Sequence, residues 1–139
     1  MAAKNRSTSD KAFADALGST VLPVIALLDT GQVMRSTGKC HFSEITVGEN
    51  VEARAADVRA VLRGLKAPKV AQASLSQAAA ALAGFAPYVE TLLYPAKEGK
   101  EVSEIGAGIE GLACAVAFHL NNAARVAGLD DVQFEISVA

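Results

Sequence analysis

The chain is poor in the residue types that most often build reactive or metal-binding sites. Its 139 residues include no tryptophan, two cysteines and two histidines, and aromatic residues make up 5% of the sequence. Two cysteines in a chain of this length do not form a disulfide framework. With no recognisable leader, this composition predicts a reducing compartment, and we expect a cytoplasmic protein.

Strong charge and long apolar runs are also missing. The formal net charge is −2 at pH 7, which predicts no strong attraction to nucleic acid or to an anionic membrane. The apolar stretch 21–28 contains Pro23 and is too short to span a bilayer. These absences exclude a basic nucleic-acid-binding domain and a membrane-spanning protein.

Small apolar residues are what the chain has in abundance. Hydrophobic residues make up 51% of the sequence, and alanine dominates them, as in the run 78–81. Such a chain can bury a core, but each small side chain buries little area, so its stability must come from close approach of helices. We expect a loose arm over residues 1–8 and a single domain over residues 9–139.

Apolar residues spaced three and four apart predict four helices, near residues 9–28, 50–66, 74–93 and 105–127. Pro23 and Pro87 should kink the first and third of them. Asp29-Thr30-Gly31 should end the first helix, Ser74 and Gln77 should cap the third, and Gly128 should end the fourth.

Three short segments predict strands instead. Residues 33–36 and 40–47 flank Thr37-Gly38-Lys39, a plausible hairpin loop, and residues 131–138 alternate between apolar and polar. The sequence therefore predicts an α+β domain in the order α-β-β-α-α-α-β. It is predominantly helical, with a small, mostly antiparallel three-stranded sheet and with the two alanine-rich helices packed as an antiparallel pair.

Residues 106–111, Gly-Ala-Gly-Ile-Glu-Gly, match the G-x-G-x-x-G pattern. The stretch 105–115 resembles the fingerprint of FAD- and NAD-binding flavoproteins, in which such a turn holds a pyrophosphate. The resemblance implies that Gly106, Gly108 and Gly111 form the turn and that Glu135 binds a ribose.

A packing role is the second interpretation of the same glycines, and we favour it. Residues 101–105 include two glutamates and a serine, unlike a buried parallel strand. Glu135 lies 29 positions after Gly106, whereas about 20 are usual. Gly108, Gly111 and Ala115 are three and four residues apart, so they would form a smooth helix face for another backbone. We therefore expect no cofactor.

Two further groups are candidates for binding a partner or a ligand. His119, Asn122 and Arg125 form a polar stripe on an otherwise apolar helix, which could bind an anion, a carboxylate or a partner protein. Arg59 and Arg63 belong to the basic side of the helix near 50–66, where no aromatic residues are interleaved for base stacking. For both groups we favour a solvated helix face over a binding role, and for the stripe a buried His119 hydrogen-bonded to Asn122 is a further interpretation.

Catalytic and metal-binding sets are not discernible. Cys40 and His41 are neighbours that would point to opposite faces of a strand, and Cys114 and His119 are five residues apart on a helix. These four residues do not suit a tetrahedral metal site. No nucleophile is paired with a base by any pattern, so we expect a protein that is not an enzyme and holds no metal.

The sequence predicts a non-enzymatic protein-binding module that acts by occupying a surface of its partner, in the manner of a small bacterial or phage regulator or inhibitor. It could also be a homodimer. Two alternatives stay open: a small-ligand or nucleotide-binding domain that uses residues 106–111, and a structural subunit of a larger assembly.

Overall fold

The computed structural model describes residues 8–40, 42–94 and 101–129, and within these ranges the chain is helical with no strand. In chain order the elements are α1 (Thr8–Ser19), α2 (Val21–Thr37), α3 (Glu44–Arg63), the 3-10 helix η1 (Lys69–Ala71), α4 (Gln72–Ala83), α5 (Phe85–Leu93) and α7 (Val102–Val126). The predicted α+β class is therefore wrong for the part of the chain described.

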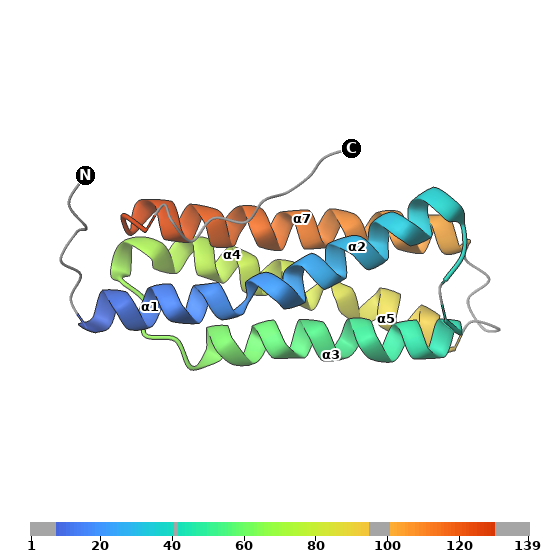
Figure 1. The fold of residues 1–139 in the computed structure, drawn as a ribbon, viewed down its shortest axis with the longest axis horizontal. Helices are drawn as coiled ribbons and strands as arrows, with labels where there is room; N and C mark the ends of the chain where they lie inside the picture. The colour runs from blue at the N-terminus through green and yellow to red at the C-terminus, as the bar shows by residue number, and fades with distance from the viewer. Residues whose placement is uncertain (1–7, 41, 95–100, 130–139) are drawn as a thin grey trace.

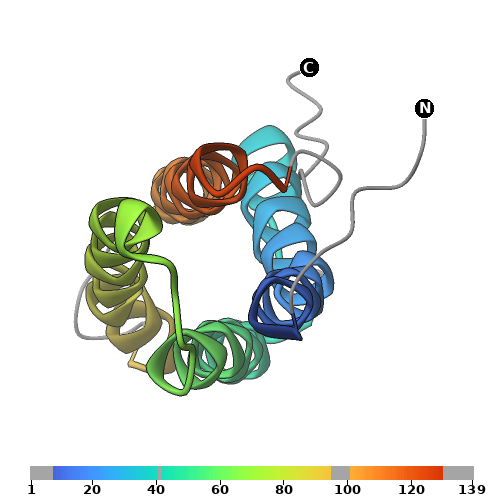
Figure 2. The ribbon, with the colours of Figure 1, turned by 90° about the vertical axis from the view of Figure 1, so that its left-hand side faces the viewer.

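These helices form four antiparallel rods (Figure 1). The rods are α1 with α2, α3 alone, α4 with α5, and α7 alone, and each runs opposite to the one before it in the chain. Seen end-on, the rods lie at the corners of a ring, with α7 between the α2 and α4 rods (Figure 2). This is the up-down-up-down arrangement of a four-helix bundle.

Two prolines divide two of the rods at matching positions. Pro23 is the third residue of α2 and Pro87 the third residue of α5. Because a proline ring clashes with the carbonyl four residues earlier, the preceding helix cannot continue past that point. Accordingly, α1 ends at Ser19 and α4 ends at Ala83, each four residues before its proline. The predicted kinks are confirmed at both sites.

The core runs along the inside of the ring and draws side chains from every rod. Its largest fully buried members are Phe13, Leu17, Val24, Leu27, Met34, Val51, Leu82, Phe85, Leu92, Ile105, Ile109 and Leu120. Alanines at 113, 117, 123 and 124 of α7 are also buried. Small residues at these positions let α7 lie close to both α2 and α4. This close packing compensates for the smaller area that each alanine buries.

The first predicted strand and the second half of the other belong to helices. Residues 33–36 are the last turn of α2, and the predicted hairpin loop is its C-terminal cap. Gly38 adopts the left-handed conformation, with φ of 66°, and donates its N–H to the carbonyl of Met34 at 2.9 Å. A glycine that ends a helix and one that turns a hairpin both need this conformation, so the residue type alone did not separate the two structures.

The start of α3 explains why the second strand was also wrong. Ser43 precedes the helix, and its hydroxyl accepts a hydrogen bond from the Thr46 N–H at 3.2 Å. This N-cap makes residues 44–47 the first turn of α3, which begins six residues earlier than the predicted helix start. The third predicted strand, residues 131–138, lies outside the described residues, as does Glu135.

Three predicted helix ends can also be checked. Asp29-Thr30-Gly31 does not end a helix, because α2 continues to Thr37. Ser74 is no cap, since α4 begins at Gln72. The stop at Gly128 is confirmed: Gly128, with φ of 76°, donates to Arg125, and Leu129 donates to Ala124 at 2.7 Å. These two bonds form a Schellman motif.

Residues Thr8–Thr37 are long and apolar enough, by length and composition only, to cross a membrane, with a mean hydropathy of 1.5 over the most apolar window. The stretch is the α1–α2 rod, interrupted at Thr20, and it contributes Phe13, Leu17 and Leu27 to the core. A core helix of a bundle meets the same criterion, so the finding does not place the chain in a membrane.

Candidate functional site

The glycines of the G-x-G-x-x-G match lie inside α7 and do not form a turn. Gly106 is the fifth residue of this helix, so its amide and those after it bond to carbonyls four residues earlier. Gly106 is buried against α2: a Cβ there would lie 2.5 Å from the backbone nitrogen of Arg35. Phosphate cradles need a loop with free N–H groups, and residues 106–111 lack this geometry.

The other two glycines of the match have different surroundings. A Cβ on Gly108 would collide with the ring of Tyr88 in α5. A Cβ on Gly111 would meet nothing within 4 Å. The predicted face of Gly108, Gly111 and Ala115 therefore does not pack against a backbone: Gly108 meets a tyrosine ring, and Gly111 faces solvent. The close backbone contact is made by Gly106, which was not part of that face.

The polar stripe on α7 is joined to α4. Asn122 donates through Nδ2 to the hydroxyl of Ser74 at 2.7 Å, and Arg125 donates to the Asn122 carbonyl oxygen. His119 lies edge-on to the exposed ring of Phe118, with centroids 5.3 Å apart. The structure therefore joins Asn122 and Arg125 into one network that anchors α7 to α4, while the His119 ring contacts Phe118.

One ion pair connects the closely packed helices α2 and α7. Arg35 donates through Nε to Glu110 Oε1 at 2.5 Å and through Nη2 to Oε2 at 3.3 Å. The hydrogen bond and the charge of Glu110 raise the pKa of Arg35 further above its already high value. Glu110 belongs to the glycine motif, so this acidic residue serves the contact between the two helices.

The cysteines are isolated thiols. Burial raises the pKa of both Cys40 and Cys114, with smaller contributions from Glu44 and Glu110 respectively. Neither thiol is activated as a nucleophile, because reactive cysteines have lowered pKa values. Among the described residues, no three His, Cys, Asp or Glu side chains are grouped to hold a metal. His41 lies outside the described ranges.

A hollow opens where α3 and α4 diverge. It has a volume of about 500 Å³, and we call it the α3–α4 groove. It is lined by Arg59, Leu62, Arg63, Leu65, Ala67, Gln72, Leu75, Ser76, Ala79 and Leu82. Leu62, Leu65 and Leu75 pack against the core on one side and stay partly open to solvent on the other. The groove thus has an apolar floor.

The charged side chains that line this groove are all positive. Two of the residues that line it, Arg59 and Arg63, are basic, and none of the described lining residues is acidic. Arg54, also on α3, is paired with Asp57 at 3.5 Å outside the groove, whereas neither Arg59 nor Arg63 has an ion pair within the described part of the chain. Two guanidinium groups beside an apolar floor suit a carboxylate-bearing apolar ligand.

A second hollow continues along the same side of α3 toward α5. It has a volume of about 200 Å³, and we call it the α3–α5 hollow. Arg59 lines both hollows, so the two are adjacent. The α3–α5 hollow adds the side chains of Glu52, Phe85, Val89, Glu90 and Tyr94.

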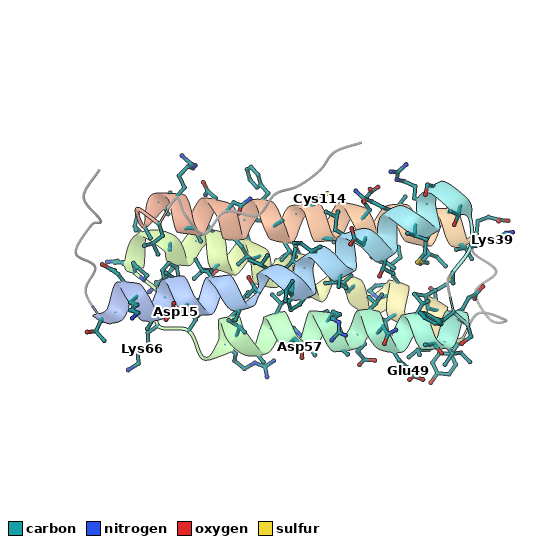
Figure 3. All side chains as sticks on the ribbon, viewed as in Figure 1. Asp15, Lys39, Glu49, Asp57, Lys66 and Cys114 are labelled. Carbon is teal, nitrogen blue, oxygen red and sulfur yellow. The ribbon has the colours of Figure 1, made fainter. Side chains whose placement is uncertain are left out.

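Sequence reasoning found Arg59 and Arg63 but missed the rest of this surface. Leu62, Leu65, Leu75 and Leu82 fit helical core stripes, and this pattern cannot tell a covered leucine from one at an open edge. Leu82 is fully buried, whereas Leu62, Leu65 and Leu75 stay partly exposed because the chain leaves α3 through Gly64–Pro68 before α4 begins, and α4 then diverges from α3. Charged side chains elsewhere, such as Glu49 and Asp57 on α3, point away from the bundle (Figure 3).

The fold and the groove define the chain as an antiparallel helical bundle with an open seam between α3 and the α4–α5 rod. Comparison with protein-family models, with curated proteins and with solved structures found no match.

Proposed function

We propose that this chain is a non-enzymatic protein-binding module whose α3–α4 groove receives an apolar segment of a partner that carries acidic residues. The observation that supports it is the pairing of a leucine floor with Arg59 and Arg63 in one groove of about 500 Å³. A segment bound there would cover the floor and place carboxylates against the two guanidinium groups.

The chemistry of the groove supports occupancy and not catalysis. Its lining offers a serine hydroxyl, Ser76, but no histidine, cysteine or carboxylate that could activate it, within the described residues. Nucleophilic catalysis requires a base within hydrogen-bond reach of the nucleophile. We therefore propose that the module acts by covering a partner's surface, as a regulator would.

Two neighbouring alanines allow a matched test. Ala79 lines the groove, and Ala80 is also exposed on α4 but does not line it. Ala79→Arg would place a long charged side chain in the groove, and Ala80→Arg makes the same chemical change on the same helix outside it. The two variants should have equal stability, which urea denaturation checks.

Each protein is immobilised, a lysate is passed over it, and captured proteins are quantified by mass spectrometry. We expect the wild type and Ala80→Arg to capture a partner with an acidic apolar segment. Ala79→Arg should reduce the amount captured at least about tenfold, because a side chain that fills the groove removes the whole contact. Equal capture by both variants would contradict the groove as the binding site. Size-exclusion chromatography with light scattering tests whether a second copy of the chain is the occupant. A dimer formed through the groove would contradict a separate partner.

A further inference from the structure

Resting on this proposed function, we infer that the partner segment is an amphipathic helix of about three turns whose charges are divided between its two ends. Its acidic end lies over Arg59 and Arg63, and its basic end lies over Glu52 and Glu90. The groove therefore fixes the direction in which the helix binds.

The first step is that the α3–α4 groove and the α3–α5 hollow form one surface. On α3, residues 52, 55, 59, 62 and 63 line one or the other, and their spacings of three, four and seven place them on one helix face. On the facing rod the lining residues continue from α4 into α5, with Leu82 in the first hollow and Phe85 in the second. Arg59 lies where the two hollows meet.

The length of this surface suits a short helix. Glu52 and Arg63 are eleven residues apart on α3, which corresponds to about 17 Å along the helix axis. A bound helix of three turns is about 16 Å long. Three turns place three or four apolar side chains on one face, enough to cover the floor from Leu75 to the Val89 region.

A helix suits this surface better than an extended segment. An extended peptide gains its affinity by pairing its backbone with the open edge of a sheet. The described residues hold no strand, and most of the residues that line the groove belong to helices, whose own backbone groups are paired. An extended peptide buried there would leave its N–H and C=O groups unsatisfied, whereas a helix satisfies them internally.

The charge of the lining reverses along the surface. The α3–α4 groove has Arg59 and Arg63 and no described carboxylate, while the α3–α5 hollow has Glu52 and Glu90, with Arg59 at its border with the groove. A helix in one direction pairs its charges with all of these side chains, and in the other direction it sets like charges together. Tyr94, exposed by 60%, closes the acidic end with an aromatic side chain.

Three synthetic helical peptides of equal length test the charge division. They share one leucine face and differ in their flanks: one has glutamates in one half and lysines in the other, one has only glutamates and one has only lysines. Binding is measured by fluorescence anisotropy. We expect the divided peptide to bind about five- to tenfold more tightly than either uniform peptide, because two exposed ion pairs are lost in each. Higher salt should reduce the difference.

The direction is tested with a photo-crosslinking residue at the acidic end of the divided peptide. In the wild type we expect adducts on α4. In the variant Glu52→Arg/Arg59→Glu/Arg63→Glu/Glu90→Arg, whose net charge is unchanged, we expect adducts on α5 and the same affinity. If the fourfold change prevents folding, the smaller variant Arg63→Glu/Glu90→Arg, in which both residues are exposed, leaves one charge of each sign at each end, and we expect its adducts to divide between α4 and α5.

Equal affinity for all three peptides, or the same adducts in the wild type and in the charge-reversed variants, would overturn the inference. Binding of a DNA duplex through Arg59 and Arg63 that outcompetes the divided peptide would overturn it as well. If the natural partner is lost with Ala79→Arg but the divided peptide shows no preference, the proposed function stands and this inference fails. If Ala79→Arg leaves capture unchanged, the proposed function itself fails.

Discussion

Gly31 of α2 and Gly106 of α7 lie against each other where these two helices cross. A Cβ on Gly31 would stand 2.9 Å from the carbonyl oxygen of Gly106, and a Cβ on Gly106 would stand 2.5 Å from the backbone nitrogen of Arg35. Both glycines are buried. The absence of side chains at these two positions therefore sets how closely α2 and α7 approach, and Arg35 and Glu110 pair across the same contact.

Alanine at either position should destabilise the bundle. The obstructing atoms belong to the backbone, so the helices must separate to admit a methyl group. We expect Gly31→Ala and Gly106→Ala each to lower the free energy of unfolding by about 1–3 kcal/mol, as overpacking does, although alanine favours helix. Urea denaturation measures the change. Unchanged stability in both variants would show that the contact is looser than described.

Gly111 provides the matched control for these substitutions. It lies in the same helix and the same sequence motif, but a Cβ there meets nothing within 4 Å. Gly111→Ala should therefore raise the free energy of unfolding by about 0.4–1 kcal/mol, because alanine loses less backbone entropy in a helix. The same urea titrations apply, and a loss of stability would mean that Gly111 has a partner of its own.

The hydrogen bond from Asn122 to Ser74 should couple α7 to α4. Ser74 is 8% exposed, so removing Asn122 leaves a nearly buried hydroxyl without this partner. We expect Ser74→Ala and Asn122→Ala each to cost about 1–2 kcal/mol, and their double-mutant cycle to give a coupling of about 0.5–1.5 kcal/mol. Ser76→Ala, on the exposed side of α4, should change stability little. A coupling near zero would contradict the bond.

The two thiols should titrate above their ordinary pKa of 9.0, because burial disfavours the thiolate. A thiol with a raised pKa in the folded state stabilises that state below pH 9, and this contribution is lost as the pH rises through the folded value. The rate of alkylation by iodoacetamide, followed against pH, should therefore have its midpoint above 9.0 for each folded cysteine and return toward 9.0 in urea.

Glu110→Gln separates the two cysteines in that experiment. Glu110 contributes to the raised pKa of Cys114, whereas the carboxylate beside Cys40 is Glu44. The substitution should lower the midpoint for Cys114 and leave the midpoint for Cys40 in place. Equal shifts at both thiols would point to a change of fold and not to the local charge.

Three of the predicted helices overlap α3, the α4–α5 rod and α7, and both proline breaks are where the sequence places them. Such features are local: the spacing of apolar residues and the clash of a proline ring involve atoms within a turn of each other. The region from 33 to 47 was mispredicted, because a short apolar run between glycines suits a strand as well as a helix end. In the structure α2 is helical to Thr37 and packs against α7 and α3, contacts that no local pattern reports.

The candidate site, like the fold, was only partly predictable from the sequence. Arg59 and Arg63 were identifiable from the sequence as part of the basic side of a helix. The apolar floor beneath them and the acidic residues beyond them were not. A groove exists because two helices diverge, and their separation depends on every contact in the bundle. The amino-acid sequence alone thus determined where the helices break and that small residues line them. The tertiary structure decided that Gly106 contacts another helix and that Leu62 of α3 and Leu75 of α4 stay partly open, since both depend on atoms far apart along the chain.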